Sequence, residues 1–282
     1  MTTAAPAPTP PTVTVRAAGQ RPRGLGLAEL VTQRELLVTL VERQARLRVK
    51  RTFFGIVWPV VSPMFLLALY LFVFGSVFDV KIDDYGVYLL VGLLPWTFLV
   101  QSVHDSLQSI SFEPDLVRRA PFPLHLLPIA RVVVMAVPFL GLLVASILYL
   151  GLVHSRGIVW STLPLIVVPV ASLLLLVTSI SMLLALLDVF NRDLRYVLNN
   201  LLTVWFFLVP IVYHRKMVNG PVRTITTADP MRWIIDQFRT ILYDGHVTSF
   251  VAPLVTLAVC SALFVVSLVV FRRLAVGLAK EV

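Results

Sequence analysis

Ionisable side chains within apolar segments are the first place to look for chemistry, because such groups bind coupling ions or act as acids and bases. No Asp or Glu lies in the middle of a long apolar run of this chain, and Asp105 and Asp188 stand at the ends of such runs. This pattern argues against a proton- or sodium-coupled carrier. If the chain were a membrane-embedded enzyme, its candidate catalytic residues would be His104 and Asp105, at the end of one run.

Motifs for other chemistry are missing as well. The sequence has no Gly-x-x-x-x-Gly-Lys-Ser/Thr loop to hold ATP phosphates and no His-Glu-x-x-His metal motif. The single cysteine, Cys260, lies in an apolar run, which excludes a disulfide framework and a Cys-based zinc site. We therefore expect no catalytic residue, metal or cofactor in this chain, and we expect the energy for any work to come from another subunit.

The composition indicates a membrane protein. Hydrophobic residues make up 58% of the 282 and charged residues 14%, with a mean hydropathy of +0.88, whereas soluble domains are about 45–50% apolar and about 25% charged. Six runs are about long enough to cross roughly 30 Å of hydrocarbon. They are approximately Pro59–Phe78, Val87–Val103, Pro128–Val153, Ile158–Leu187, Tyr196–Tyr213 and Phe250–Phe271. We therefore predict an all-α membrane protein with six transmembrane helices.

The basic residues indicate the orientation of these spans. If the N-terminus is inside, 17 of the 24 Lys and Arg residues fall in inside segments and 7 in outside loops. Because inside loops carry the excess of positive charge, both termini should be cytoplasmic. The net charge of +9 thus indicates topology and contact with anionic lipid rather than with nucleic acid. Arginine outnumbers lysine 20 to 4, and we expect the plasma (inner) membrane of a bacterium.

Four regions follow from the patterning. Residues 1–26 are rich in Pro, Thr and Ala and are expected to form a disordered tail without a signal peptide. Residues 27–58 hold an amphipathic helix, Leu27–Lys50, which we expect in the headgroup plane, and the approach to the first span. A soluble helical appendage is the alternative. Residues 59–273 form the six-span domain, and 274–282 a cytoplasmic tail.

The approach to the first span combines charge with chain-breaking residues. Arg48, Lys50 and Arg51 can bind anionic headgroups, and Trp58 suits the interface. A plain positive-inside anchor would explain the charges but not the break at Gly55.

The inside loop after the second run carries charges of both signs before a Pro-Phe-Pro sequence. We expect it to present a short, rigid helix to a cytosolic partner, and an ordinary connector is the alternative. The residues concerned are Glu113, Pro114, Asp115, Arg118, Arg119, Pro121, Phe122 and Pro123.

The long outside loop before the last run contains a second amphipathic stretch. Asp229 followed by Pro230 matches a helix N-cap and first-turn position, and apolar residues then recur at helical spacing. We predict a short helix over Pro230–Tyr243 that lies in the outer interface or re-enters the bundle. Re-entrant backbone is tolerated only where protein or a water-filled cavity satisfies it.

A series of short elements, in order from about Leu36 to Arg273, resembles the ABC-2-type permeases that export polysaccharides and teichoic acids. The elements are the basic approach with Lys50, Arg51, Gly55, Trp58 and Pro63; Gly92, Leu93, Trp96 and Phe98; Phe122, Pro123 and Pro128; Arg192, Asp193 and Tyr196; Pro210 and Tyr213; and Asp229, Pro230, Phe238 and Arg239.

The resemblance implies partners and roles. It implies a homodimer of permeases bound to two copies of an ATP-binding subunit, which holds ATP and Mg. It implies that Glu113 to Phe122 dock into that subunit, that the surface helix touches it, and that the segment after the fifth span forms an external gate. We expect the path or gate at Tyr70, Phe74, Trp96, Phe98, Trp205, Phe206, Pro210, Tyr213 and Phe238. For each aromatic residue, an outer aromatic belt is the alternative.

The function that follows is a transport subunit rather than an enzyme. The expected substrate is a lipid-linked polysaccharide, such as an O-antigen (the outer glycan of lipopolysaccharide) or a teichoic acid, which is moved out across the plasma membrane. An ABC-2 exporter of small lipophilic drugs or lipids is the alternative, followed by a membrane-embedded transferase. A channel or structural role is opposed by the docking-like inside loop.

Overall fold

The computed structural model describes residues 27–50, 58–77, 82–113, 122–153, 161–191, 193–214, 221–245 and 249–278. Within these ranges the regular structure is helical throughout, without strands, which confirms the predicted all-helical class. Several expected site residues lie outside them: Arg51, Gly55, Pro114, Asp115, Arg118, Arg119 and Pro121.

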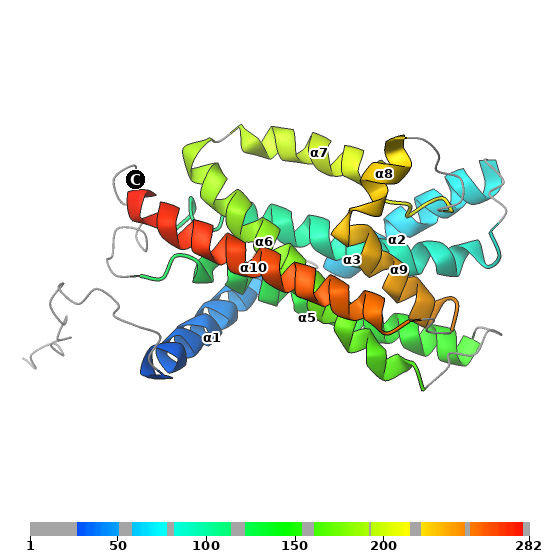
Figure 1. The fold of residues 1–282 in the computed structure, drawn as a ribbon, viewed down its shortest axis with the longest axis horizontal. Coiled ribbons are helices and arrows are strands. Elements are labelled where there is room, and N and C mark those ends of the chain that lie inside the picture. Colours follow the sequence, from blue (N-terminus) through cyan, green and yellow to red (C-terminus); the bar gives the residue numbers. More distant parts are fainter. Residues whose placement is uncertain are drawn as a thin grey trace, which may run out of the picture.

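Figure 1 shows the arrangement of the helices. In chain order they are α1 (Leu27–Lys50), α2 (Trp58–Tyr70) continued as the π-helix η2 (Leu71–Val77), α3 (Tyr85–Leu107), α5 (Leu126–Val153), the 3-10 helix η3 (Leu163–Ile166), α6 (Val167–Phe190), α7 (Leu194–Leu208), α8 (Pro221–Thr227), α9 (Pro230–Leu242) and α10 (Val251–Leu278).

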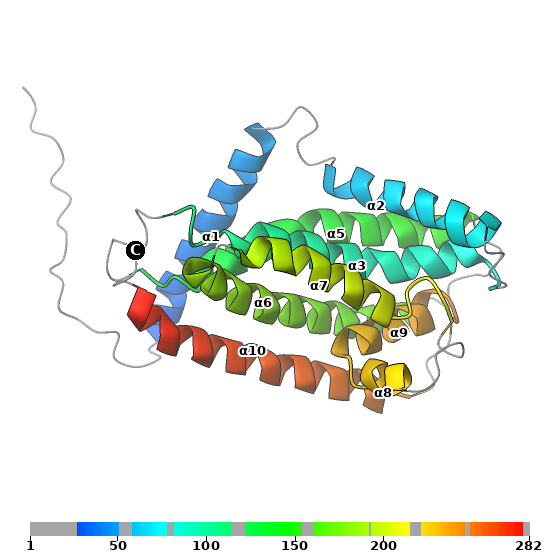
Figure 2. The ribbon, with the colours of Figure 1, turned by 90° about the horizontal axis from the view of Figure 1, so that it is seen from above.

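Helix α3 forms the centre of the bundle. It packs against α5 and α6, and α10 packs along the other side of α6, so that α2 and α10 lie on opposite sides of the molecule (Figure 2). In the most apolar 18-residue window of α3, 78% of the residues are buried, against 22% in α10. Many apolar side chains of α5 and α10 are exposed, such as Val137 (64%), Leu152 (82%) and Val265 (57%). A surface of this kind is stable in lipid rather than in water.

In the part of the chain that the structure describes, four helices are long and apolar enough to cross a membrane, so the chain is a multi-pass membrane protein. They occupy Tyr85–Leu107, Leu126–Leu152, Leu163–Phe190 and Val251–Ala275. The first and fifth predicted runs instead contain shorter apolar helices, Val61–Gly75 and Leu194–Leu208. At 1.5 Å per residue, the 15 residues of α7 rise only about 22 Å.

The prediction that the fifth run continues as a span to Tyr213 is wrong, because α7 ends at Leu208. The reason is Pro210. A proline disfavours the helical conformation in the residue before it, and Val209 is extended, with φ −77° and ψ 127°. The fourth run also begins differently, with the 3-10 turn η3 around Pro164 before α6 starts at Val167. At the other end of the chain, α10 continues past residue 273 to Leu278.

Helix α1 has the bounds predicted from its periodicity. Its apolar stripe packs on protein: Leu40 is buried together with Leu126, Leu127 and Phe271, at the end of the bundle where α5 begins and α10 ends. Polar residues such as Arg34 remain exposed. The stripe therefore fixes α1 against the ends of the long helices, at an angle to them (Figures 1 and 2).

Candidate functional site

The end of the bundle next to α1 is joined by ion pairs, the first of which centres on Asp105. Its Oδ1 lies 2.6 Å from Nη2 of Arg48 on α1 and 3.6 Å from Nη1 of Arg131 on α5. Arg48 also contacts the sulfur of Met135. Asp105, which an embedded enzyme would have used together with His104, thus links α1, α3 and α5.

A second carboxylate, Asp188 near the end of α6, is completely buried. Its Oδ2 accepts a hydrogen bond of 2.8 Å from the hydroxyl of Ser111, and its Oδ1 one of 3.2 Å from Nε of Arg195. With its oxygen turned toward Arg195, the amide of Gln108 accepts from the same guanidinium at 2.9 and 3.1 Å. These contacts tie the start of α7 to the segment that leads from α3 into the expected docking loop.

The first residue of that loop, Glu113, forms an ion pair with Arg43 of α1 at 3.0 Å. At the other end of the loop, Phe122 packs against the same apolar cluster as α1, and Pro123 is half-buried. The structure therefore brings both ends of the loop next to α1, on one face of the molecule.

Aromatic side chains gather between α2, α3 and α7. Tyr70 stacks on Phe206 with ring centroids 5.2 Å apart and meets Phe74 at 6.0 Å. Trp96 lies 5.6 Å from both Trp205 and Phe206. Five of the nine residues predicted for the path thus form one cluster, although they come from four elements.

Two adjoining cavities open beside this aromatic cluster, and Trp96 and His104 line both. The smaller has a volume of about 170 Å³, and its lining includes Tyr70, Asn199 and Phe207. The larger, of about 680 Å³, reaches the ion pairs near α1, and its lining includes Arg48, Gln101, Asp105 and Met135. The surface between α2, α3 and α7 is therefore aromatic toward α7 and charged toward α1.

The turn after α7 is fixed by side chains from two other helices. Arg239 of α9 donates to the carbonyl oxygens of Pro210 (2.6 Å) and Ile211 (2.7 Å). Two tyrosine hydroxyls at the start of α3 donate to the next two carbonyls, Tyr85 to Val212 (2.9 Å) and Tyr88 to Tyr213 (3.0 Å). We call these four carbonyls and the three side chains that bind them, Tyr85, Tyr88 and Arg239, the carbonyl clamp.

The guanidinium of Arg239 is held in a narrow space. Its side chain is 6% exposed, and its Cζ lies 3.7 Å from the ring centroid of Tyr88, a cation–π contact. On the α3 side it meets Gly92, where an added Cβ would lie only 2.8 Å from Nη2 of Arg239. Only glycine leaves room for this contact.

Asp229 connects the start of α9 to α7. Its Oδ1 accepts from the backbone N–H of Met231 at 2.9 Å, which confirms the predicted N-cap, and its Oδ2 accepts from Nε1 of Trp205 at 2.8 Å. Burial raises the pKa of the Asp229 carboxyl, while these hydrogen bonds act in the opposite direction. The aromatic cluster and the carbonyl clamp are thus joined through one side chain.

The sequence of the chain is similar to those of a known protein family. The sequence profile described as ABC-2 type transporter matches residues 35–243. The chain belongs to the ABC-2 type transporter family. It is 31% identical over 237 residues to an O-antigen export system permease protein RfbA of Myxococcus xanthus. The aligned region covers 83% of this chain and 89% of that protein. The chain is 25% identical over 242 residues to a protein of the same name from Klebsiella pneumoniae, covering 81% and 92%.

Several elements behind the resemblance to ABC-2 permeases meet in space. Gly92 and Arg239 touch, Arg239 binds the carbonyl of Pro210, and the carbonyl of Tyr213 is bound from α3. Trp96, four residues after Gly92, contacts Trp205. ABC-2 permeases are transport subunits, and in this chain their short motifs build one contact region between α3, α7 and α9.

Two residues predicted for the path lie elsewhere. Phe98 stacks on Phe139 of α5 at 4.6 Å, and Phe238 is completely buried in the core; neither lines the two cavities beside the aromatic cluster. Conversely, no role was predicted for Arg239, Asp188 or the tyrosines of α3. For Arg239 the sequence does contain a signal, because this charged residue interrupts the otherwise apolar stripe of the helix predicted over Pro230–Tyr243.

The first prediction concerns Gly92. We expect Gly92→Ala to lower the melting temperature in detergent, because the new Cβ displaces the guanidinium from two buried carbonyls. The matched control is Gly141→Ala in α5, where a Cβ meets nothing within 4 Å. Alanine is favoured over glycine in a helix by about 1 kcal/mol, so the control should unfold no earlier than the wild type. Equal melting temperatures for the two variants would contradict the close contact.

The second prediction concerns the buried pair of Asp188 and Arg195. Arg195→Met leaves the carboxylate buried without its cation, and we expect a loss of about 3–5 kcal/mol in the free energy of unfolding. Asp188→Leu leaves Arg195, whose side chain is 35% exposed and reaches solvent, so the loss should be smaller. Denaturant titration of both variants tests this order, and the reverse order would refute it.

Proposed function

We propose that this chain is the membrane subunit of an ATP-driven exporter of lipid-linked polysaccharide. The observation that carries the proposal is its similarity, over 83% of its length, to a permease named for O-antigen export. The aromatic cluster supports it, because aromatic faces stack on the C–H faces of sugars.

The face beside α1 is proposed to dock the ATP-binding subunit, which supplies ATP and Mg. Residues 113–123 start and end against α1, and the ion pair of Arg43 with Glu113 holds both parts in one surface. Because Arg43 is 47% exposed, this pair adds little stability. The ion pair instead holds α1 and the start of the loop in a defined relative position, so that one partner can contact both.

A second copy of the chain is proposed to complete the path, giving a homodimer with two ATP-binding subunits. Phe207 lines the smaller cavity and is 53% exposed. Other aromatic side chains of α2, η2 and α7 are exposed as well: Phe65 (78%), Phe72 (65%) and Tyr196 (76%). A cavity that is open on one side in a single chain becomes an enclosed path when a second copy faces it. A lipid-linked glycan would then meet a charged mouth near Arg48 and Asp105, followed by aromatic walls.

The proposed topology has six spans, with α2–η2 and α7 crossing as well, and both termini in the cytoplasm of a bacterial cell. Helix α1 then lies at the inner headgroup level, and α8 and α9 lie toward the outer face. The charge distribution of the sequence supports this orientation.

A third prediction tests this topology by single-cysteine labelling in a Cys260→Ala background, since Cys260 is buried. Three exposed residues are to be replaced by cysteine, one at a time: Thr39, Phe112 and Ala228. We expect an impermeant maleimide to label Ala228→Cys in spheroplasts, and Thr39→Cys and Phe112→Cys only after permeabilisation. Phe112 decides the number of spans, because α2 must cross for it to lie on the same side as Thr39. Labelling of Phe112→Cys from outside would contradict six spans.

A fourth prediction tests the function itself. Deleting the gene in its native host should remove a surface polysaccharide and cause its lipid-linked form to accumulate inside the cell, with recovery on expression of the wild type. Glu113→Lys places a cation against Arg43 and should lower export roughly tenfold. The control is Glu42→Lys, because among the described residues the ion pair of Glu42 is with Arg46 of the same helix. Unchanged surface polysaccharide together with new sensitivity to lipophilic drugs would favour the drug exporter instead.

A further inference from the structure

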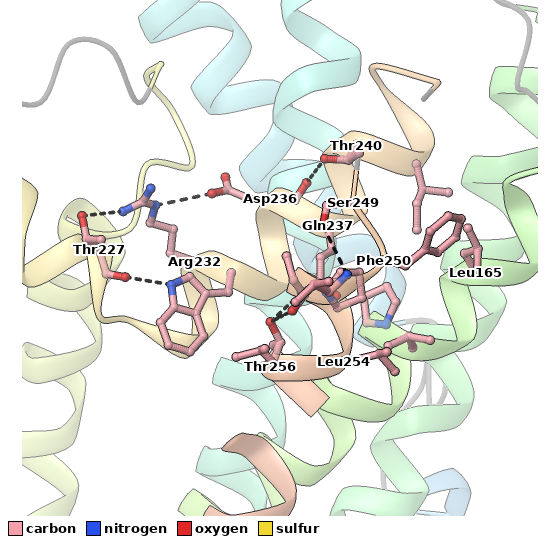
Figure 3. Close-up of a pocket in the computed structure, with 18 residues that line it drawn as sticks. Leu165, Thr227, Arg232, Asp236, Gln237, Thr240, Ser249, Phe250, Leu254 and Thr256 are labelled. Carbon is pink, nitrogen blue, oxygen red and sulfur yellow. Dashed lines mark hydrogen bonds and ion pairs between the residues drawn. The ribbon is translucent and has the colours of Figure 1, made fainter. Parts of the chain in front are cut away.

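A third cavity lies between α9, η3 with the start of α6, and the start of α10 (Figure 3). Helices α9 and α10 are on the other side of the bundle from α2 (Figure 2). Its volume is about 670 Å³. Much of its wall is apolar, including Leu165, Phe250 and Leu254, and its polar side chains come mainly from α9. It shares no lining residue with the two cavities beside the aromatic cluster.

Two polar atoms of this wall, Nε of Arg232 and Oε1 of Gln237, are buried without a hydrogen-bond partner. Thr256 donates its hydroxyl proton to the carbonyl of Ala252 (2.9 Å), so its oxygen accepts from Nε2 of Gln237 (2.7 Å). This arrangement fixes the Gln237 amide with Oε1 as its free acceptor. The Gln237 residue is 8% exposed, and its Oε1 is buried without a hydrogen-bond partner. A buried acceptor of this kind requires a donor, and Gln237 lies in the cavity wall (Figure 3).

A cation stands five residues before Gln237 on the same helix. Arg232 is 3% exposed and lines the same cavity, held by Thr227 at 3.3 Å and by Asp236 at 3.4 Å. Next to it, Trp233 is fixed by a hydrogen bond of 2.8 Å from its Nε1 to the carbonyl of Thr227. The polar side of the cavity therefore offers a guanidinium for an anion and an acceptor for a hydrogen-bond donor.

The rest of the cavity wall is largely apolar and indicates what a ligand with an anionic group and a hydrogen-bond donor must also contain. It begins at Phe250 and Val251, where the apolar helix α10 starts, and continues to Leu254 and Val255 along it. A ligand of matching chemistry has a phosphate beside a hydroxyl or ammonium group, followed by hydrocarbon.

We propose that this cavity binds one phospholipid with a donor-bearing headgroup, either phosphatidylethanolamine or phosphatidylglycerol. The phosphodiester lies toward Arg232, the ammonium or hydroxyl group donates to Oε1 of Gln237, and an acyl chain runs along α10. Because α9 also carries Arg239, a lipid bound along this helix supports the element that holds the carbonyl clamp. The proposal does not depend on which substrate is exported.

The test is native mass spectrometry of the purified full-length chain titrated with single phospholipids. Phosphatidylcholine is the discriminating probe, because it has the same phosphate and chains but no N–H or O–H donor. We expect phosphatidylethanolamine and phosphatidylglycerol to bind about tenfold more tightly than phosphatidylcholine. In Gln237→Met this preference should disappear while all three lipids still bind.

The matched control is Gln101→Met, which changes a glutamine in the wall of the cavity beside α2 and should keep the preference. Equal binding of the three lipids to the wild type would overturn the proposal, as would an unchanged preference in Gln237→Met or its loss in Gln101→Met. If Gln237→Met does not fold, photo-crosslinking of a diazirine-labelled phosphatidylethanolamine to the wild type decides the question. Crosslinks are expected in peptides of α9 and the start of α10, and crosslinks confined to α2 and α7 would refute the site.

Discussion

The carbonyl groups of residues 210–213 impose the constraint on which the outer half of the molecule depends. An irregular turn among apolar neighbours leaves carbonyl oxygens that need donors, and each one left without a partner costs several kcal/mol in hydrocarbon. The carbonyl clamp supplies a donor to all four. Two of its side chains come from the central helix and one from α9. The end of α7, the start of α3 and the position of α9 are therefore set by the same hydrogen bonds.

The opposite end of the bundle is held by charge. Asp105 and Asp188 each join three elements, and Glu113 adds a surface contact to α1. Neither aspartate stands alone in the apolar interior, which explains how acidic residues are tolerated beside long apolar helices. Because Arg195 lies at the start of α7 and Trp205 near its end, this one short helix contacts both polar regions. A displacement of the segment before the docking loop would thus reach the aromatic cluster through α7.

The helical class, α1 and α9 could be predicted from the sequence because each depends on neighbours along the chain. Periodicity gave the bounds of α1, and Asp229 with Pro230 gave the start of α9. The end of α7 was missed because the apolar run continues past Pro210, and hydropathy does not record that a proline stops the helix. The carbonyl clamp could not be predicted, since Tyr85 and Val212 lie 127 residues apart. The short motifs marked the positions of Gly92 and Arg239, but only the fold shows that the small residue makes room for the large one.

The shortness of α7 has a consequence for the surrounding bilayer. As a span, its rise of about 22 Å falls short of the roughly 30 Å of a typical hydrocarbon layer. Lipid accommodates such a mismatch by thinning locally. The deformation would be greatest beside α7, where aromatic side chains are exposed. A polar headgroup that crosses the membrane at this position would pass through less hydrocarbon than anywhere else around the protein, so the permease would lower the barrier to transfer through the shape of the bilayer as well as through its own side chains.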